Sequence, residues 1–165
     1  GDVIAPEGPD YPTQFIDVRD LADFVLLLTS NRVHGTFNAD GPVVTLRTLL
    51  STIQTSSAVE SKVVYVPGDV LTEKGIQPWS ELPLWIPGLS GTDGSTDTQK
   101  STAIGLFSRP LRDTVTATRA WLETDTREIK WVRTLTKEKD QVGPHANKRK
   151  GAEHPVSIVT SSLLP

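Results

Sequence analysis

The chain has 165 residues, which is enough for one compact domain and too few for two of ordinary size. A net charge of −3 offers no basic footprint for nucleic acid, and the absence of cysteine excludes disulfides, thiolate catalysis and cysteine–metal sites. The longest apolar run, Phe24 to Leu28, is far short of the roughly 20 residues that cross a bilayer, and no signal-peptide pattern is visible. We therefore expect a cytoplasmic protein with neither nucleic acid nor a membrane as partner.

The first predicted elements are a short strand and a strongly apolar helix. The β-branched and aromatic residues of Gln14 to Val18 follow a turn signal and predict a strand. Asp17 can then cap a helix that runs through roughly Thr29, because its carboxylate accepts amide protons at the first turn. Four of its six apolar residues fall at helical spacing, and Leu26 and Leu27 widen this apolar face, so we expect the helix to be covered on more than one side. The six residues are Leu21, Phe24, Val25, Leu26, Leu27 and Leu28.

Two more strands and one helix follow. Residues Thr36 to Ala39 predict a second strand, and Asp40-Gly41-Pro42 turns the chain. Thr45 is a helix cap, and the next helix carries a stripe of Leu46, Leu49, Leu50 and Ile53. Lys62 to Val66 predicts the third strand, which Pro67-Gly68 ends. Strand-then-helix units recur, so the predicted fold class is α/β.

The second half is less regular. Residues 76–97 predict an ordered loop without repeating structure, because its apolar residues are too numerous for a solvated linker. Leu111, Val115, Trp121 and Leu122 indicate an amphipathic helix, and Trp131 with Leu135 starts a last short one. The polar and basic stretch after Gln141 predicts a poorly ordered tail. The expected division is residues 1–140 as one lobe and residues 141–165 as the tail.

Candidate chemistry is sparse. His34 is the only histidine outside the predicted tail, and beside Gly35 at a helix end it more readily complements the helix dipole than forms a catalytic group. No histidine pair has metal-ligand spacing. Asp17, Asp20 and Asp23 lie close together, and we interpret them as a cap and first-turn acids.

Three glycines match a dinucleotide-binding spacing. Gly88, Gly91 and Gly94 have it, but the motif binds a pyrophosphate only between a strand and a helix. Pro87 precedes these glycines, and no apolar helical stripe follows them. We interpret the match as a coincidence in a loop, so no cofactor is expected to bind this chain alone.

Two tryptophans in the irregular loop have two interpretations. Trp79 and Trp85 can pin the loop onto the body of the protein, or they can wall an apolar substrate pocket, since pockets are lined by aromatic residues with few polar groups. The two interpretations are compatible.

A resemblance to a known protein family indicates a function, which the spacing of apolar residues does not. The run from Pro12 to Ala22 resembles a signature of extended short-chain dehydrogenases/reductases, where it begins the strand and helix of the substrate lobe. Residues 35–42 look like the following strand and turn, and residues 45–50 look like the next helix. Residues 97–105, 109–111 and 121–122 are similar to the terminal pattern, in which a short helix ends in Gly-Leu and a last helix ends in Trp. The opening residues 1–9 resemble the loop before the first signature.

The resemblance extends to the loop at residues 79–85. Its Trp-Ser-Glu-Leu-Pro-Leu-Trp sequence is similar to that of NAD-dependent epimerase/dehydratase-type reductases. The resemblance covers about residues 1–140 and implies the carboxy-terminal substrate lobe, without the Rossmann half that binds NAD or NADP. It implies a small-molecule substrate contacted by residues of the signature and of this loop. The candidate substrate-binding residues are Gln14, Phe15, Trp79, Leu82 and Trp85.

Departures from the family pattern limit the expected activity. The glycine-rich turn and the Tyr-x-x-x-Lys pair of the family are absent, since Tyr11 is followed four positions later by Phe15 and Tyr65 by Asp69. We therefore expect no catalysis by this chain alone. The arginines with which nucleotide-sugar enzymes hold a diphosphate are also absent, at Thr13 and at residues 66–69.

Three functional hypotheses remain open. The first is a fragment of an NAD(P)-dependent reductase of carbonyl or alcohol compounds, whose partner is the missing Rossmann half. The second is a sugar-nucleotide epimerase or dehydratase fragment, which the missing arginines disfavour. The third is a non-enzymatic sensor or interaction module. In each case, an isolated lobe with exposed apolar surface is expected to bind hydrophobic dyes and to self-associate.

Overall fold

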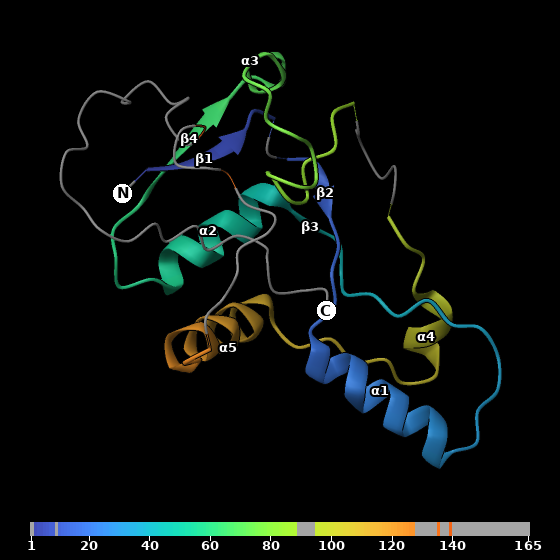
Figure 1. Ribbon diagram of the computed structural model, residues 1–165. Coiled ribbons are helices and arrows are strands. Elements are labelled where there is room, and N and C mark those ends of the chain that lie inside the picture. The colour runs from blue at the N-terminus through green and yellow to red at the C-terminus, as the bar shows by residue number, and fades with distance from the viewer. Residues whose placement is uncertain (1, 9, 89–94, 128–134, 136–138, 140–165) are drawn as a thin grey trace. The chain divides into compact units, whose positions relative to one another are not determined.

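The chain forms a small mixed α/β structure, seen in a computed structural model that describes residues 2–8, 10–88, 95–127, 135 and 139 (Figure 1). The described residues contain five helices and two sheets of two strands each. The chain divides into two compact units, which are described separately. The sheet unit comprises residues 1–9, 57–89 and 126–165, and the helical unit comprises residues 10–56 and 90–125.

A parallel pair of strands organises the sheet unit. Strand β1 (Asp2–Pro6) pairs with β4 (Lys62–Val66), with Ile4 opposite Val64, and helix α3 (Gly68–Glu73) follows β4 directly. The prediction of β4 is confirmed at both ends, whereas residues 2–6, which resemble part of a family loop, form a strand instead. The β-branched sequence of β4 announces a strand by itself, but β1 becomes a strand because β4 supplies a partner for its backbone hydrogen bonds.

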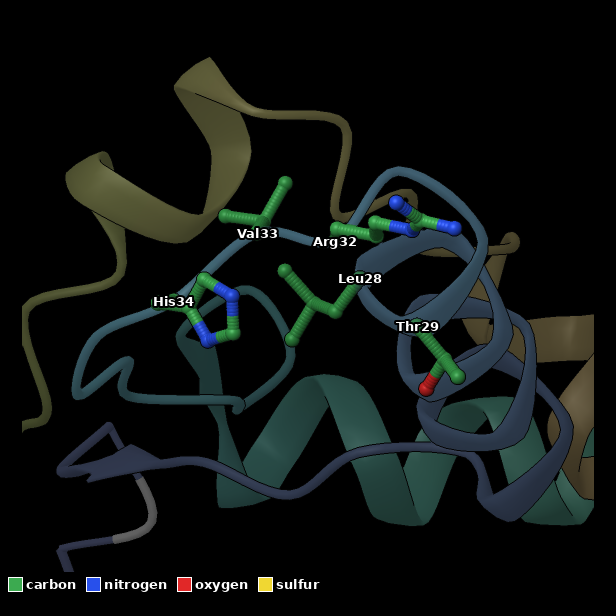
Figure 2. A pocket seen from close by; sticks show the side chains of 5 residues that line it. All are labelled: Leu28, Thr29, Arg32, Val33 and His34. Atoms are coloured by element: carbon green, nitrogen blue, oxygen red, sulfur yellow. The ribbon is translucent and has the colours of Figure 1, made fainter.

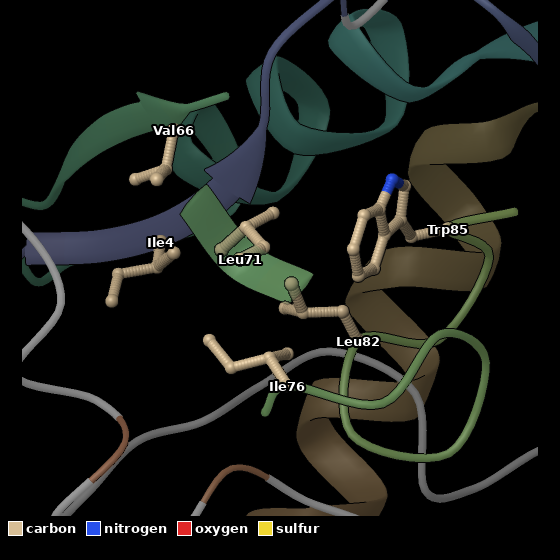
Figure 3. Packing of buried hydrophobic residues seen from close by; sticks show 6 residues of the cluster. All are labelled: Ile4, Val66, Leu71, Ile76, Leu82 and Trp85. Atoms are coloured by element: carbon tan, nitrogen blue, oxygen red, sulfur yellow. The ribbon is translucent and has the colours of Figure 1, made fainter. Parts of the chain in front are cut away.

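The hydrophobic core of the sheet unit joins the strands to the irregular loop. Figure 3 shows six of its buried side chains, which come from β1, β4, α3 and the loop after α3. The members of this core cluster are Ile4, Val66, Leu71, Ile76, Leu82 and Trp85. The half-buried Leu135 packs against them. The loop at residues 76–88 is therefore ordered by apolar burial, although it contains neither helix nor strand.

Four helices make up most of the helical unit. They are α1 (Val18–Ser30), α2 (Leu46–Ser56), α4 (Gln99–Ala103) and α5 (Leu111–Thr124). Both predicted caps are confirmed: Asp17 Oδ1 accepts from the Arg19 amide at 2.9 Å, and Thr45 Oγ1 accepts from the Thr48 amide at 3.0 Å. The apolar stripe of α2 is buried at Leu46, Leu49 and Leu50, and α2 packs against α5 (Figure 1).

Two predicted strands of this unit are absent. Instead of strands at residues 14–18 and 36–39, two-residue strands β2 (Pro12–Thr13) and β3 (Val44–Thr45) pair antiparallel. Side chains of α4 explain the second error: Lys100 Nζ donates to the Thr36 carbonyl at 2.8 Å, and Ser101 Oγ donates to the Asn38 carbonyl. Because these carbonyls have side-chain partners, the segment needs no neighbouring strand.

Several predictions fall outside the described residues. They concern Gly91, Gly94, the helix expected to begin at Trp131, and the tail at residues 141–165, so the division near residue 140 stays a prediction. No helix among the described residues combines the length and the apolar character needed to span a membrane.

Candidate functional site

Gln14 holds three segments of the helical unit together. Its side-chain amide nitrogen donates to the carbonyls of Gly41 at 2.9 Å and Thr96 at 3.1 Å, and its amide oxygen accepts from the Thr96 amide at 2.6 Å. Gly41 lies so close to the carbonyl oxygen of Phe15 that any Cβ at residue 41 would overlap it. In this arrangement the Gln14 side chain bonds backbone groups of the protein, and Phe15 is half-buried beside the same turn.

A loop with two strained residues displays Trp79 on the sheet unit. Trp79 and Leu84 have φ of 61° and 66°, the left-handed region that bulky residues rarely adopt. The Trp79 amide donates to the Trp85 carbonyl at 3.1 Å, which closes the loop. Trp85 is 5% exposed and Leu82 is 9% exposed, both within the core shown in Figure 3, whereas Trp79 is 48% exposed. Of these three candidate residues, Trp79 therefore offers the most surface to a ligand.

An ion pair fixes the same loop. Lys139 Nζ contacts both carboxylate oxygens of Glu81 at 2.8 Å and donates to the Gly75 carbonyl at 2.7 Å. Glu81 Oε2 also accepts from the Gln77 amide at 2.7 Å. The loop is thus held by core side chains at Leu82 and Trp85 and by charged side chains at Glu81.

The cap residue Asp17 and the aspartates Asp20 and Asp23 of α1 contact an arginine from far along the chain, Arg109. Asp20 accepts from Arg109 through Nε at 2.6 Å and through the backbone amide at 2.9 Å. Asp17 bonds Arg19 through both carboxylate oxygens and accepts from the Thr114 hydroxyl at 2.8 Å. The Arg19 guanidinium holds the pKa of Asp17 far below its ordinary value, so the carboxylate stays charged at neutral pH.

This cluster therefore has a structural role that the sequence analysis described only in part. Asp17 is the expected cap, but Asp17 and Asp20 also anchor the segment that enters α5. The family motif includes Arg109, but no sequence pattern predicted its pairing with Asp20, because the two residues lie 89 positions apart along the chain.

Two surface hollows lie in the helical unit. One is formed at the end of α1 by Leu28, Thr29, Arg32, Val33 and His34, and Figure 2 shows the Arg32 guanidinium pointing away from His34. The two basic side chains therefore do not converge on a common point. The second is lined by Asp40, Gly41, Pro42, Thr98, Thr102, Leu106, Phe107 and Ser108.

Neither hollow contains a catalytic constellation. The first has an exposed imidazole without a carboxylate among its lining residues, and the second has one carboxylate with hydroxyl groups and apolar rings. Across the described residues, no group of three histidine, aspartate or glutamate side chains could hold a metal ion.

The five candidate substrate-binding residues fall into two sets. Gln14 and Phe15 are neighbours in the helical unit, and Trp79, Leu82 and Trp85 belong to one loop of the sheet unit. Their contact with a substrate stays a prediction. Comparison with protein-family models, with curated proteins and with solved structures found no match to this chain.

Proposed function

We propose that this chain is the carboxy-terminal, substrate-binding part of an NAD(P)-dependent reductase that acts on small carbonyl or alcohol compounds. The observation that carries the proposal is the order of the helices in the helical unit. Helix α1 follows the cap Asp17, α2 follows Thr45, α4 precedes Gly105-Leu106, and α5 follows Arg109-Pro110. Each helix thus begins or ends at one of the motifs on which the resemblance to extended short-chain dehydrogenases/reductases rests.

Hydride transfer in this proposal depends on a Rossmann half. That half would hold the nicotinamide of NAD or NADP against the substrate and supply the acid–base pair. Tyr11 of this chain is not suited to that role: burial raises its pKa above the ordinary value, and its hydroxyl makes no hydrogen bond within the described residues. A tyrosine that exchanges protons near neutral pH needs the opposite shift.

Helix α1 supports the proposed dependence on another part of the enzyme. Val18, Val25 and Leu26 are each more than half exposed, although a helix of this composition is expected to be covered on more than one side. We assign this face to packing on the Rossmann half.

A dye experiment tests the role of this face. The double variant Val25→Lys/Leu26→Lys should reduce the fluorescence of bound Nile red, an uncharged hydrophobic dye, by half or more, because two charges interrupt the apolar face. The control is Val59→Lys, which changes a residue that is also more than half exposed but lies outside α1. Equal dye binding by all three proteins would contradict the assignment of α1.

The decisive test is titration of the purified chain with NADH and NADPH, followed by nicotinamide fluorescence. The chain alone should not bind either cofactor, whereas a longer protein with a glycine-rich turn and Tyr-x-x-x-Lys upstream should oxidise NADH or NADPH with small ketones. Micromolar cofactor binding by the chain alone would refute the proposal. Turnover of a sugar nucleotide by the longer protein would favour the epimerase alternative, and no cofactor binding by the longer protein would favour a non-enzymatic module.

A further inference from the structure

The backbone of the loop after α3 is strained where it displays Trp79. A left-handed φ brings Cβ close to the following carbonyl oxygen, which is costly for any residue except glycine. Both Trp79 and Leu84 adopt it. Such strain persists only where surrounding interactions impose it, and it concentrates at ligand sites.

The interactions that impose this strain are visible in the loop. The Trp79 and Trp85 residues are joined by a backbone hydrogen bond, and the Trp85 amide donates to the Leu82 carbonyl at 3.2 Å. Gln77 accepts from the Glu81 amide at 3.1 Å through its carbonyl, and Glu81 is held by Lys139. The backbone of Trp79 is therefore fixed before any ligand arrives, so binding there would require little ordering of the chain.

The two tryptophans of the loop have different environments. The Trp85 ring lies in the core of the sheet unit (Figure 3), whereas Trp79 is about half exposed. A core role accounts for Trp85 and for the hydrogen bond that it gives to the loop. It does not account for Trp79, a large aromatic residue that is about half exposed on a strained backbone.

We propose that Trp79 is the surface on which a flat, uncharged aromatic ring of the carbonyl substrate stacks. The inference rests on the proposed function and narrows its substrate class. An indole offers a rigid planar face to another planar ring, with offset or edge-to-face geometry. The stretch from residue 62 to residue 88 contains no arginine, so it lacks the fork that binds a carboxylate or phosphate in two places.

The test compares two ketones of equal carbon number by NMR on the full ¹⁵N-labelled chain. Acetophenone should shift the indole N–H signal of Trp79, which Trp79→Phe identifies by removing it. Cyclohexyl methyl ketone, which has the same acetyl group on a saturated ring, should bind about three- to tenfold more weakly. Benzoate should bind no better than acetophenone, because the loop offers its charge no arginine.

Variants assign the effect to the exposed ring. Trp79→Ala should weaken acetophenone binding about three- to tenfold, measured from the other signals that shift, and Trp79→Phe should stay within about threefold of the parent chain. The control Trp121→Phe alters the exposed tryptophan of α5 and should leave binding unchanged. Far-UV circular dichroism verifies that each variant is folded.

Three results would overturn the proposal: equal affinity for both ketones, unchanged affinity in Trp79→Ala, or tighter binding of benzoate. Its failure is distinct from failure of the proposed function, because the latter is measured with NADH and NADPH. A longer protein that reduces saturated and aromatic ketones equally well would retain the reductase assignment and remove the role of Trp79.

Discussion

Replacing Arg109 with alanine tests whether a single buried carboxylate secures the helical unit. Asp20 is 3% exposed and Arg109 is 20% exposed, and their side chains meet at 2.6 Å. The substitution removes this charged hydrogen bond and leaves one oxygen of Asp20 without that donor. The backbone amide of residue 109 still reaches the other oxygen, at 2.9 Å.

The expected loss follows from these contacts. A hydrogen bond to a charged group contributes about 1.5–3 kcal/mol, and removing one partner of a buried ion pair costs about 3–5 kcal/mol. Because Arg109 is partly exposed and the backbone hydrogen bond remains, we expect a loss in the range for a charged hydrogen bond and not in the range for a buried ion pair. The contacts of Arg109 with Asp17 and Asp23 are longer, at 3.7 Å, and Asp23 is exposed, so they add little. We expect Arg109→Ala to lower the free energy of unfolding by about 2–3 kcal/mol.

Urea denaturation followed by far-UV circular dichroism measures this loss. Four of the five described helices belong to the helical unit, so the helical signal reports mainly on that unit. The control Arg112→Ala removes an exposed arginine of α5 and should change stability by less than about 0.5 kcal/mol. In the double variant Asp20→Asn/Arg109→Ala, removal of the buried charge should recover at least about 1 kcal/mol relative to the summed single losses. Equal losses in the two arginine variants, or strict additivity in the double variant, would refute the reasoning.

Three further predictions concern the helical unit. Because the Arg19 guanidinium lowers the pKa of folded Asp17, this carboxylate stabilises the fold above about pH 4, and the stabilisation is lost as the pH falls further. A denaturation series from pH 7 to pH 2 should therefore show that Arg19→Ala loses less stability in acid than the parent chain does. Gly41→Ala places a methyl group against the Phe15 carbonyl and should cost about 2–3 kcal/mol in urea denaturation, and a loss below 1 kcal/mol would contradict this contact. Arg32 has φ of 52° just after α1, so Arg32→Gly should raise the melting temperature, with a gain of about 0.5–1 kcal/mol, and an unchanged or lower value would count against strain at this residue.

The helices show how much of the fold local sequence encodes. Asp17 and Thr45 each stand directly before an apolar helical stripe, and a capping side chain bonds amides only two or three residues away. The same locality explains the prediction of β4, whose valines and tyrosine favour a strand without reference to the rest of the chain. Helix α3 was missed because six residues between Pro67 and Lys74 are too few to display a helical period.

The candidate site was less accessible to sequence reasoning. The composition identified the loop that contains Trp79 and Trp85, but it did not distinguish the buried tryptophan from the exposed one. Burial of Trp85 against Gly68 and the strained φ of Trp79 depend on how the loop returns upon itself. The role of Gln14 depends in the same way on Thr96, which lies 82 residues later.

The amino-acid sequence by itself determined the helices with local caps, the strand β4 and the absence of cysteine chemistry. The tertiary structure alone decided which backbone segments pair and which charged side chains are buried. The strand β1 exists because β4 lies beside it, the segment at residues 36–39 is not a strand because α4 bonds its carbonyls, and Asp20 is buried because Arg109 meets it there. Each of these outcomes depends on a partner distant in sequence, since backbone groups and buried charges must be satisfied by whatever the fold brings near.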